Sequence, residues 1–185
     1  MMHAEPTVLD GVVEFTPRRF SDGRGWFSET WNSRTFLEAG VDLDWVQDNE
    51  SFSQDVGTVR GIHFQSEPMA QDKLVRVAQG KILDVAVDLR RSSSAFGQWV
   101  ACELSADAGN QLLVPKGYGH AFCTLVPECL VQYKVSNFYS TEHDRAVAWN
   151  DPTIGIDWPD VVGQAVVSAK DLAAPLLHDA LDLFS

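Results

Sequence analysis

The chain has 185 residues, 45% of them apolar, which is enough for one domain to bury a substantial core without disulfide or metal cross-links. Its net charge of −12, with only 14 lysines and arginines, excludes the broad basic face needed to bind a nucleic-acid backbone. The N-terminus lacks a basic region followed by an apolar stretch, and no run of about 18 apolar residues occurs, so neither secretion nor membrane spanning is expected. Because Cys102, Cys123 and Cys129 match no C-x-x-C spacing, we expect reduced thiols in a cytoplasmic protein.

Short strands are expected along most of the chain. Apolar and polar residues alternate over residues 26–31, 74–77, 83–89, 98–104 and 129–135. Turn-forming residues, mostly around a glycine, separate these runs at short intervals. Many short strands joined by such turns predict an all-β sandwich or barrel.

Two short helices are expected beside the strands. The first covers about Arg34–Ala39, with Asn32 or Ser33 as its cap and a glycine directly after it. The second is expected near Ala173–Ala180, after an Ala-Pro pair. The sequence contains no internal repeat, low-complexity tract or linker, so residues 1–185 are expected to form a single domain.

Three titratable residues interrupt segments that otherwise read as buried strands. Arg60 and His63 lie in Thr58–Gln65, and Lys73 begins the next strand-like run. Taken singly, the histidine could be a satisfied core residue and the lysine a solvated strand start. Buried charges are costly unless they are paired, so three such groups together favour a site for an anionic or polar ligand. Arg60 and His63 share one strand face only if Gly61 forms a β-bulge.

Two further residues are candidates for this site. His120 lies in the glycine-rich stretch Pro115–Phe122, where small residues let the backbone come close to a ligand, although a tight hairpin explains the same pattern. Tyr133 shares its strand parity with Val131 and Val135, so we expect it to point inward. A core tyrosine that needs only a hydrogen-bond partner is the alternative.

Metal and cofactor sites are not predicted. A cupin-type metal centre resembles H-x-H followed by a glutamate and a distant histidine, whereas His63–Gln65 supplies one histidine, and His3, His143 and His178 lie in terminal or polar contexts. The sequence has no G-x-G-x-x-G, P-loop or G-x-S-x-G motif. We therefore expect chemistry by protein side chains, without a metal or cofactor.

From about Phe15 to Leu177, the chain resembles the dTDP-4-dehydrorhamnose 3,5-epimerases. The order and spacing of six segments carry the resemblance: Asp22–Gly25, Gln47–Ser51, Val59–Gln65, Pro115–Phe122, Trp149–Pro152 and Ser168–Asp171. The resemblance implies a cupin-like jelly roll with a few short helices, in which the C-terminal segment, about 165–185, packs back over the site. It also implies a homodimer whose N-terminal strands pair with the partner's sheet.

The resemblance further implies a cofactor-free reaction on a nucleotide sugar, in which both carbons beside the ketone of a dTDP-linked 4-keto-6-deoxyhexose are inverted. His63 matches the base of the family, and Asp171 matches the aspartate that hydrogen-bonds to it. Tyr133 matches the acid on the opposite face of the sugar, and Lys73 matches the cation near the keto oxygen.

The resemblance also implies a set of substrate-binding residues, with cations suited to the diphosphate: Arg24, Glu29, Gln47, Asn49, Arg60, Lys73, His120, Asp144 and Lys170. From strand parity we expect Asp84 to brace His120. Two positions depart from the family pattern, Asp144 in place of glutamate and Phe138 in place of tyrosine. These departures leave open an epimerase that inverts a single carbon. A metal-dependent cupin enzyme and a non-catalytic sugar-binding jelly roll are the alternatives from other classes.

Overall fold

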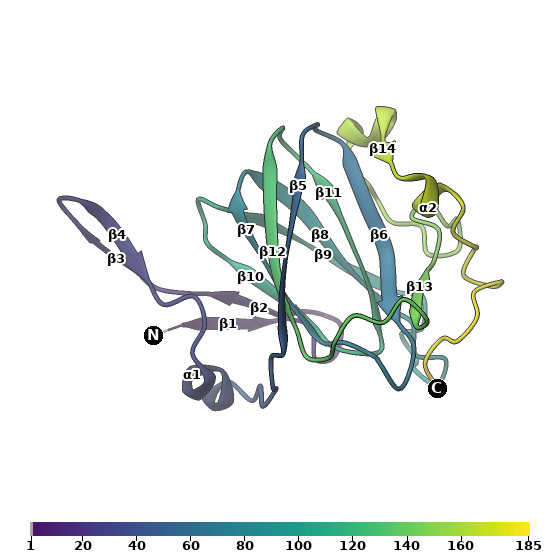
Figure 1. Cartoon of the computed structure of the whole chain (residues 1–185), viewed down its shortest axis with the longest axis horizontal. Helices are drawn as coiled ribbons and strands as arrows, with labels where there is room; N and C mark the ends of the chain where they lie inside the picture. Colours follow the sequence, from purple (N-terminus) through teal and green to yellow (C-terminus); the bar gives the residue numbers. More distant parts are fainter. Residues whose placement is uncertain (1) are drawn as a thin grey trace.

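The computed structural model describes residues 2–185, except for the side chain of Gln164, and consists mainly of two packed antiparallel sheets (Figure 1). In spatial order, the first sheet contains β1 (His3–Pro6), β2 (Val13–Thr16), β10 (Gln111–Val114), β7 (Lys73–Gln79), β12 (Cys129–Val135) and β5 (Gln47–Ser53). The second sheet contains β13 (Asp144–Ala146), β6 (Thr58–Gln65), β11 (Tyr118–Thr124), β8 (Lys81–Asp88) and β9 (Trp99–Ser105), with β14 (Val166–Val167) parallel to β6. The predicted all-β, cupin-like jelly roll is confirmed.

The main core lies between the two sheets and follows the predicted alternation. Val75 and Val77 of β7, Ile82 and Ala86 of β8, and Val131 of β12 belong to one buried cluster. Side chains of the same parity on these strands therefore point into the space between the sheets. This parity also determines which polar residues can reach that space.

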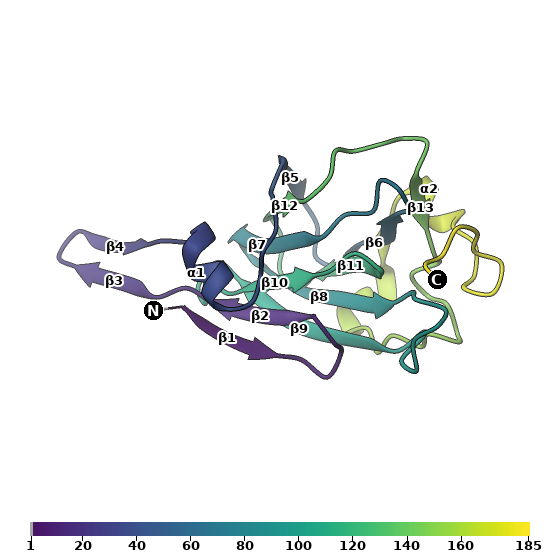
Figure 2. The ribbon, with the colours of Figure 1, turned by 90° about the horizontal axis from the view of Figure 1, so that it is seen from below.

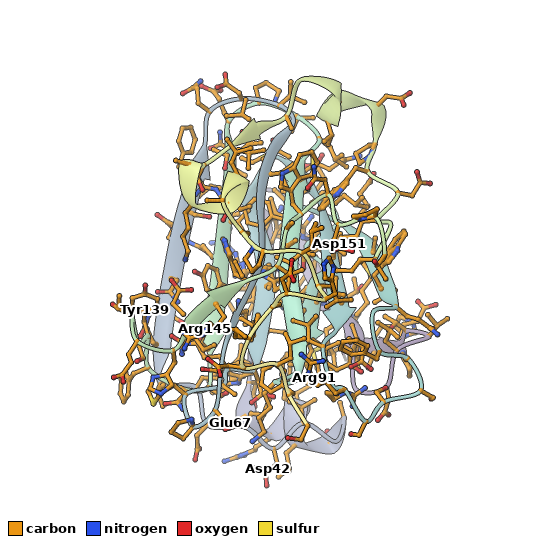
Figure 3. All side chains as sticks on the ribbon, turned by 90° about the vertical axis from the view of Figure 1, so that its right-hand side faces the viewer. Asp42, Glu67, Arg91, Tyr139, Arg145 and Asp151 are labelled. Carbon is orange, nitrogen blue, oxygen red and sulfur yellow. The ribbon has the colours of Figure 1, made fainter. Side chains whose placement is uncertain are left out.

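A second apolar layer covers the outer face of the second sheet. Ile62 and Phe64 of β6 pack with Val87 of β8, and Leu177 of the C-terminal segment belongs to the same cluster. Asp151 lies among the C-terminal segments that cover this face (Figure 3). Strand β6 is thus covered on both faces, which explains why its residues are almost all buried.

A hairpin formed by β3 (Arg19–Asp22) and β4 (Gly25–Ser28) projects from the body of the molecule (Figure 2). Its Trp26 and Phe27 side chains are 57% and 69% exposed, and Phe20 is 50% exposed. Such a concentration of exposed aromatic side chains on a two-stranded hairpin is typical of a segment that packs against another chain.

The first predicted helix is confirmed. Helix α1 covers Ser33–Glu38, and the Asn32 side chain caps it by accepting a hydrogen bond from the Arg34 backbone N–H at 3.0 Å. Phe36 anchors the helix to the first sheet through Phe15, with ring centroids 4.7 Å apart.

The second predicted helix, near Ala173–Ala180, is wrong. Helix α2 covers Ala169–Leu172, and a 3₁₀ helix, η1, covers Asp160–Gln164. The Ser168 hydroxyl caps α2 by accepting from the Asp171 N–H at 3.1 Å. Pro175 disfavours helical conformation in the residue before it, and the Asp151 carboxylate instead accepts from the Leu177 N–H at 2.7 Å.

Over residues 2–185, no helix has the length and apolar character to cross a membrane.

Candidate active site

A β-bulge at Gly61 brings Arg60 and His63 to the same face of β6. His63 pairs with His120 and Arg60 pairs with Phe122, so β6 has one more residue than β11 over this interval. Gly61 has φ +127°, and a Cβ atom there would lie 2.4 Å from the Cβ of Ala121. Gly61 thus forms the β-bulge that Arg60 and His63 need to share one strand face, and only glycine fits this position.

His63 contacts a buried carboxylate held by α2. Its Nε2 lies 2.5 Å from Oδ1 of Asp171, whose side chain is 3% exposed. Burial acts to raise the pKa of Asp171, but the hydrogen bond and charge of His63, together with donors from Ser168 and Gly61, outweigh it and hold the pKa below its usual range. The carboxylate therefore stays ionised and fixes the imidazole ring.

His63 opens into a cavity of about 260 Å³ that both sheets line. His63 comes from β6 of the second sheet, whereas Lys73 and Tyr133 come from β7 and β12 of the first. The remaining lining residues are Gln47, Asn49, Phe64, Gln65, Gln71, Tyr139, Asp144 and Lys170. The imidazole and the phenol thus reach one cavity from facing sheets.

The protonation of Lys73 and Tyr133 depends on burial. Burial is the main cause that lowers the pKa of Lys73 to about 8; the carboxylates of Asp84 and Asp144 oppose this shift, and the charge of Lys170 adds to it. Burial also raises the pKa of Tyr133 above its usual value, so the phenol keeps its proton at neutral pH. The cavity therefore combines a neutral phenol with a lysine that loses its proton more easily than an exposed one.

Three residues form a polar rim beside the cavity. The Lys170 Nζ donates to Oδ2 of Asp144 at 2.5 Å, and the Tyr139 hydroxyl donates to the same oxygen at 3.0 Å. Tyr139 is 56% exposed and lies at the edge of the face shown in Figure 3. Asp144, despite being shorter than the expected glutamate, thus contacts both neighbours directly.

Strand β5 contributes Gln47 and Asn49 to the cavity wall, and the Gln47 amide donates to the Asn49 side-chain oxygen at 2.7 Å. His120 lies beside His63 in the β6–β11 ladder and is buried. Its Nε2 lies 2.8 Å from Oδ1 of Asp84, as expected from strand parity. The histidines of two histidine–aspartate pairs therefore lie on the neighbouring strands β6 and β11.

Four of the predicted substrate contacts are not part of the cavity lining: the buried His120 and three arginine or glutamate residues. Arg24 is at the tip of the projecting hairpin, where it donates to Asp22 at 2.6 Å. Glu29 lines a separate hollow at the base of the hairpin. Arg60 crosses to the first sheet and donates to the Ser53 hydroxyl and the Phe52 carbonyl, and its charge acts on nearby Tyr133.

The sequence interpretation assigned no role to Gln65, which lines the cavity. Its amide nitrogen donates to the carbonyls of Met69 and Phe138 at 2.6 and 3.1 Å, and its oxygen accepts from the Ser140 N–H at 2.7 Å. The available signal was a polar residue two positions after His63, on the same strand face. Gln65 thus ties the strand that carries His63 to the loop that carries Tyr139.

Within residues 2–185, no group of three or more histidine, cysteine, aspartate or glutamate side chains could hold a metal ion. His63 and His120 are each hydrogen-bonded to an aspartate instead.

Comparisons with known proteins show the family to which the chain is related. A family model described as dTDP-4-dehydrorhamnose 3,5-epimerase matches residues 6–179. The chain is 50% identical over 176 residues to the dTDP-4-dehydrorhamnose 3,5-epimerase of Sinorhizobium fredii, covering 95% of this chain and 90% of the relative. It is 36% identical to a dTDP-4-dehydrorhamnose 3-epimerase of Streptomyces niveus, covering 98% and 86%.

Among solved structures, the chain is similar to the dTDP-4-dehydrorhamnose 3,5-epimerase of Bacillus anthracis, crystallised with TDP and pyrophosphate bound. The TM-score is 0.92 and the identity 48%, and the match covers 95% of this chain and 99% of the other. Sequence and fold therefore agree over nearly the whole length. The chain belongs to the dTDP-4-dehydrorhamnose 3,5-epimerase family.

Proposed function

We propose that the chain inverts both carbons beside the ketone of dTDP-4-dehydro-6-deoxy-D-glucose and thereby forms dTDP-4-dehydro-L-rhamnose. Family membership makes it an isomerase of nucleotide sugars. The observation that carries the proposal is the placement of His63 and Tyr133 on facing sheets around one cavity. Inversion of a carbon needs a base on one side and an acid on the other.

His63 is the proposed base. The Asp171 carboxylate beside Nε2 holds a proton on that nitrogen, which leaves Nδ1 free to accept a proton from carbon. The carbon–hydrogen bond beside the ketone breaks, and its electron pair moves through the carbonyl to form an enolate oxygen. Asp171 stabilises the resulting imidazolium without itself taking the proton.

Tyr133 is the proposed acid. Its phenol gives a proton to the same carbon from the opposite face while the enolate collapses to the ketone, which inverts the centre. Lys73 supplies the positive charge that stabilises the enolate oxygen. Proton exchange with solvent then returns the imidazolium to imidazole and the phenolate to phenol, and the same cycle acts on the second carbon.

We place the diphosphate of the substrate near cationic side chains at the cavity mouth. Lys170 lies at the rim, and Arg60 lies beside Tyr133. Both residues match binding positions of the family, and guanidinium and ammonium groups are suited to phosphate oxygens. Gln47, Asn49, His120 and the Asp144 rim would contact the sugar and its linkage.

We further propose that the active unit is a homodimer in which the hairpin of one chain completes the site of the other. The hairpin exposes Trp26 and Phe27 and carries Arg24 at its tip, outside the cavity of its own chain. Packing of this hairpin against a second copy would bury the aromatic side chains and bring Arg24 and Glu29 toward the partner's site.

The free thiols Cys102, Cys123 and Cys129 support a reducing compartment such as the cytoplasm.

Mixing two inactive variants tests this arrangement. A dimer of one Arg24→Ala chain and one His63→Ala chain contains one complete site if Arg24 acts on the partner and none if it acts on its own chain. After the variants are unfolded and refolded together, we expect activity well above that of either variant alone. Activity no higher than the sum of the separately refolded variants, with heterodimers present by mass spectrometry, would contradict the proposal.

Proton NMR in deuterated water tests the reaction. The purified protein is incubated with dTDP-4-dehydro-6-deoxy-D-glucose, without added metal or cofactor, and deuterium is followed at both carbons beside the ketone. Uptake at both carbons, with a rhamno-configured product after reduction, is the expected result. Uptake at one carbon would indicate a single-carbon epimerase, and binding without uptake would favour a sugar-binding module. Activity lost to a chelator and restored by a metal would favour a metal-dependent cupin enzyme.

A further inference from the structure

Asp84 is a buried carboxylate that its hydrogen bonds only partly explain. It lies on β8 with 0% exposure, and Oδ1 is 2.8 Å from Nε2 of His120. Its other oxygen, Oδ2, is buried and has no hydrogen-bond partner within the described part of the chain. A half-satisfied buried carboxylate costs stability, so its presence calls for an explanation beyond the fold.

The charged and titratable groups around Asp84 come from several strands. His120 contacts it from β11, and Cys102 lies opposite it on β9. The Lys73 Nζ of β7 lies 3.5 Å from the backbone carbonyl oxygen of His63, the residue that pairs with His120, and the negative charge of Asp84 acts on this ammonium group. Lys73 is also acted on by Asp144 and Lys170 from the cavity rim. The thiol of Cys102 has its pKa raised to about 12, chiefly by burial, and therefore stays neutral. Asp84 is thus a negative charge placed behind two groups that match substrate contacts.

We propose that Asp84 is a positioning residue for the reaction: its carboxylate orients His120 toward the sugar and places a negative charge behind the ammonium of Lys73, which holds the enolate oxygen. This inference rests on the proposed epimerase function and assigns a role to a residue behind the cavity wall. The free oxygen is then a source of negative potential, and a second hydrogen-bond donor would weaken that potential.

The sign of the effect follows from the environment of Lys73. Burial favours the neutral amine and lowers the pKa of Lys73 to about 8, and the negative charge of Asp84 acts against that loss. Replacing the carboxylate by an uncharged amide should therefore lower the pKa of Lys73 further. Near pH 8, where Lys73 is about half protonated, the fraction that carries the charge needed for the enolate would fall.

Asp84→Asn separates this electrostatic role from a structural one. The asparagine side-chain oxygen can still accept a hydrogen bond from His120, so the shape is kept while the charge is lost. Asp88→Asn is a matched control, because Asp88 lies on the same strand, is also fully buried, and contacts Arg90 rather than the cavity residues. Both variants remove one buried negative charge.

The first measurement is the titration of Lys73 by NMR of the side-chain ε-carbons in protein labelled on lysine. The chain has only five lysines, and Lys73→Arg identifies the signal. We expect Asp84→Asn to lower the Lys73 pKa by about one unit, and Asp88→Asn to leave it unchanged. An unchanged Lys73 titration in folded Asp84→Asn would overturn the proposal, whatever reaction the protein catalyses.

The second measurement is the pH profile of kcat. A one-unit fall from about 8 predicts that the protonated fraction of Lys73 in Asp84→Asn is about one eighth of the wild-type fraction at pH 8.5 and about half of it at pH 7. The loss of kcat relative to wild type should therefore grow about fourfold between pH 7 and pH 8.5, and it should be small at pH 6.5. A loss of the same size at every pH would reduce Asp84 to a structural role. Inactive wild-type protein combined with the expected NMR shift would refute the epimerase function and retain the link between Asp84 and Lys73.

Asp84→Glu keeps the proposal testable if the amide variant does not fold. This variant retains the charge and displaces the carboxylate by one methylene. We expect the Lys73 titration and the alkaline limb of the profile to stay within about 0.3 pH unit of wild type, with a lower rate at all pH values. An alkaline limb shifted to lower pH by a full unit would contradict the role of the charge.

Discussion

Strand β8 carries two fully buried aspartates, Asp84 and Asp88, which differ in how many of their carboxylate oxygens are hydrogen-bonded. Asp88 has both oxygens occupied, by the Arg90 backbone and guanidinium and by the Ser93 hydroxyl at 2.7 Å. Asp84 has one oxygen occupied, and the other has no hydrogen-bond partner in the part of the chain that the structure describes. A buried carboxylate with both oxygens hydrogen-bonded is typical of a structural role, whereas one with an unpaired oxygen beside a cavity indicates a functional role.

The two regions also differ in charge balance. The Arg90 guanidinium pairs directly with Asp88 and lies over the Tyr118 ring, with 4.6 Å from its central carbon to the ring centroid. Burial acts to raise the pKa of Asp88, but its hydrogen bonds and the charge of Arg90 hold the pKa below its usual range. At Asp84 the nearby cationic groups belong to the cavity instead. Removing side chains from the two regions should therefore affect different properties.

The largest expected effect is on turnover. His63→Ala removes the proposed base, and we expect kcat to fall about 10³-fold or more, because general acid–base catalysis contributes about 10² to 10⁴. The variant should stay folded but melt at a somewhat lower temperature, because the buried Asp171 carboxylate loses its imidazole partner. His178→Ala, at an exposed histidine of the C-terminal segment, is the control and should match wild type in kcat. Substantial turnover by the folded His63→Ala variant would show that another residue is the base.

The scaffold region should show the reverse behaviour. Asp88→Asn weakens hydrogen bonds to a cation, and we expect the free energy of unfolding to fall by about 2 kcal/mol at pH 7, measured by urea denaturation. Because the folded pKa of Asp88 is depressed, its stabilisation is present above the unfolded pKa and is lost as pH falls through the folded one. The difference between variant and wild type should therefore shrink in acid. A shifted pH profile of kcat would show that the two regions are not independent.

The kcat of the wild-type protein should itself fall at alkaline pH, and this is the smallest of the changes that we predict. Because the pKa of Lys73 is lowered to about 8, kcat should decline as pH rises through that value, by about fourfold at pH 8.5 relative to its plateau. Lys73→Arg keeps its charge over this range, so any residual activity of this variant should lack that decline. If kcat of both proteins declined at the same alkaline pH, the decline would belong to a group other than Lys73.

The fold was predictable because local patterns and tertiary structure agree. Alternation in Lys81–Asp88 and Cys129–Val135 corresponds to strands with one face in the core, and the Asn32 cap defines the start of α1. The C-terminal helix was misplaced because apolar residues after Pro175 were interpreted as helical. Their apolar side chains instead cover the second sheet, and the actual helix was indicated by the serine and aspartate spacing of Ser168–Asp171.

The site was predictable in part, for a similar reason. Parity gave the inward direction of Tyr133 and the Asp84–His120 contact, and the glycine gave the bulge at Gly61. The role of Gln65 was missed because its partners are backbone groups of two loops, which no short-range pattern reports. Arg24 shows a different limit: the resemblance places it in the binding set, whereas within one chain it lies outside the cavity.

If a base and an acid act on the same carbon from facing sheets, Tyr133→Phe should remove the acid and leave the base in place. The variant is incubated with substrate in deuterated water, and both the label and the configuration of each carbon beside the ketone are measured by NMR. We expect deuterium to enter recovered starting sugar with its original configuration, because His63 can remove a proton and return a deuteron on its own face. Inverted product formed at the wild-type rate, or no deuterium uptake by the folded variant, would contradict this arrangement.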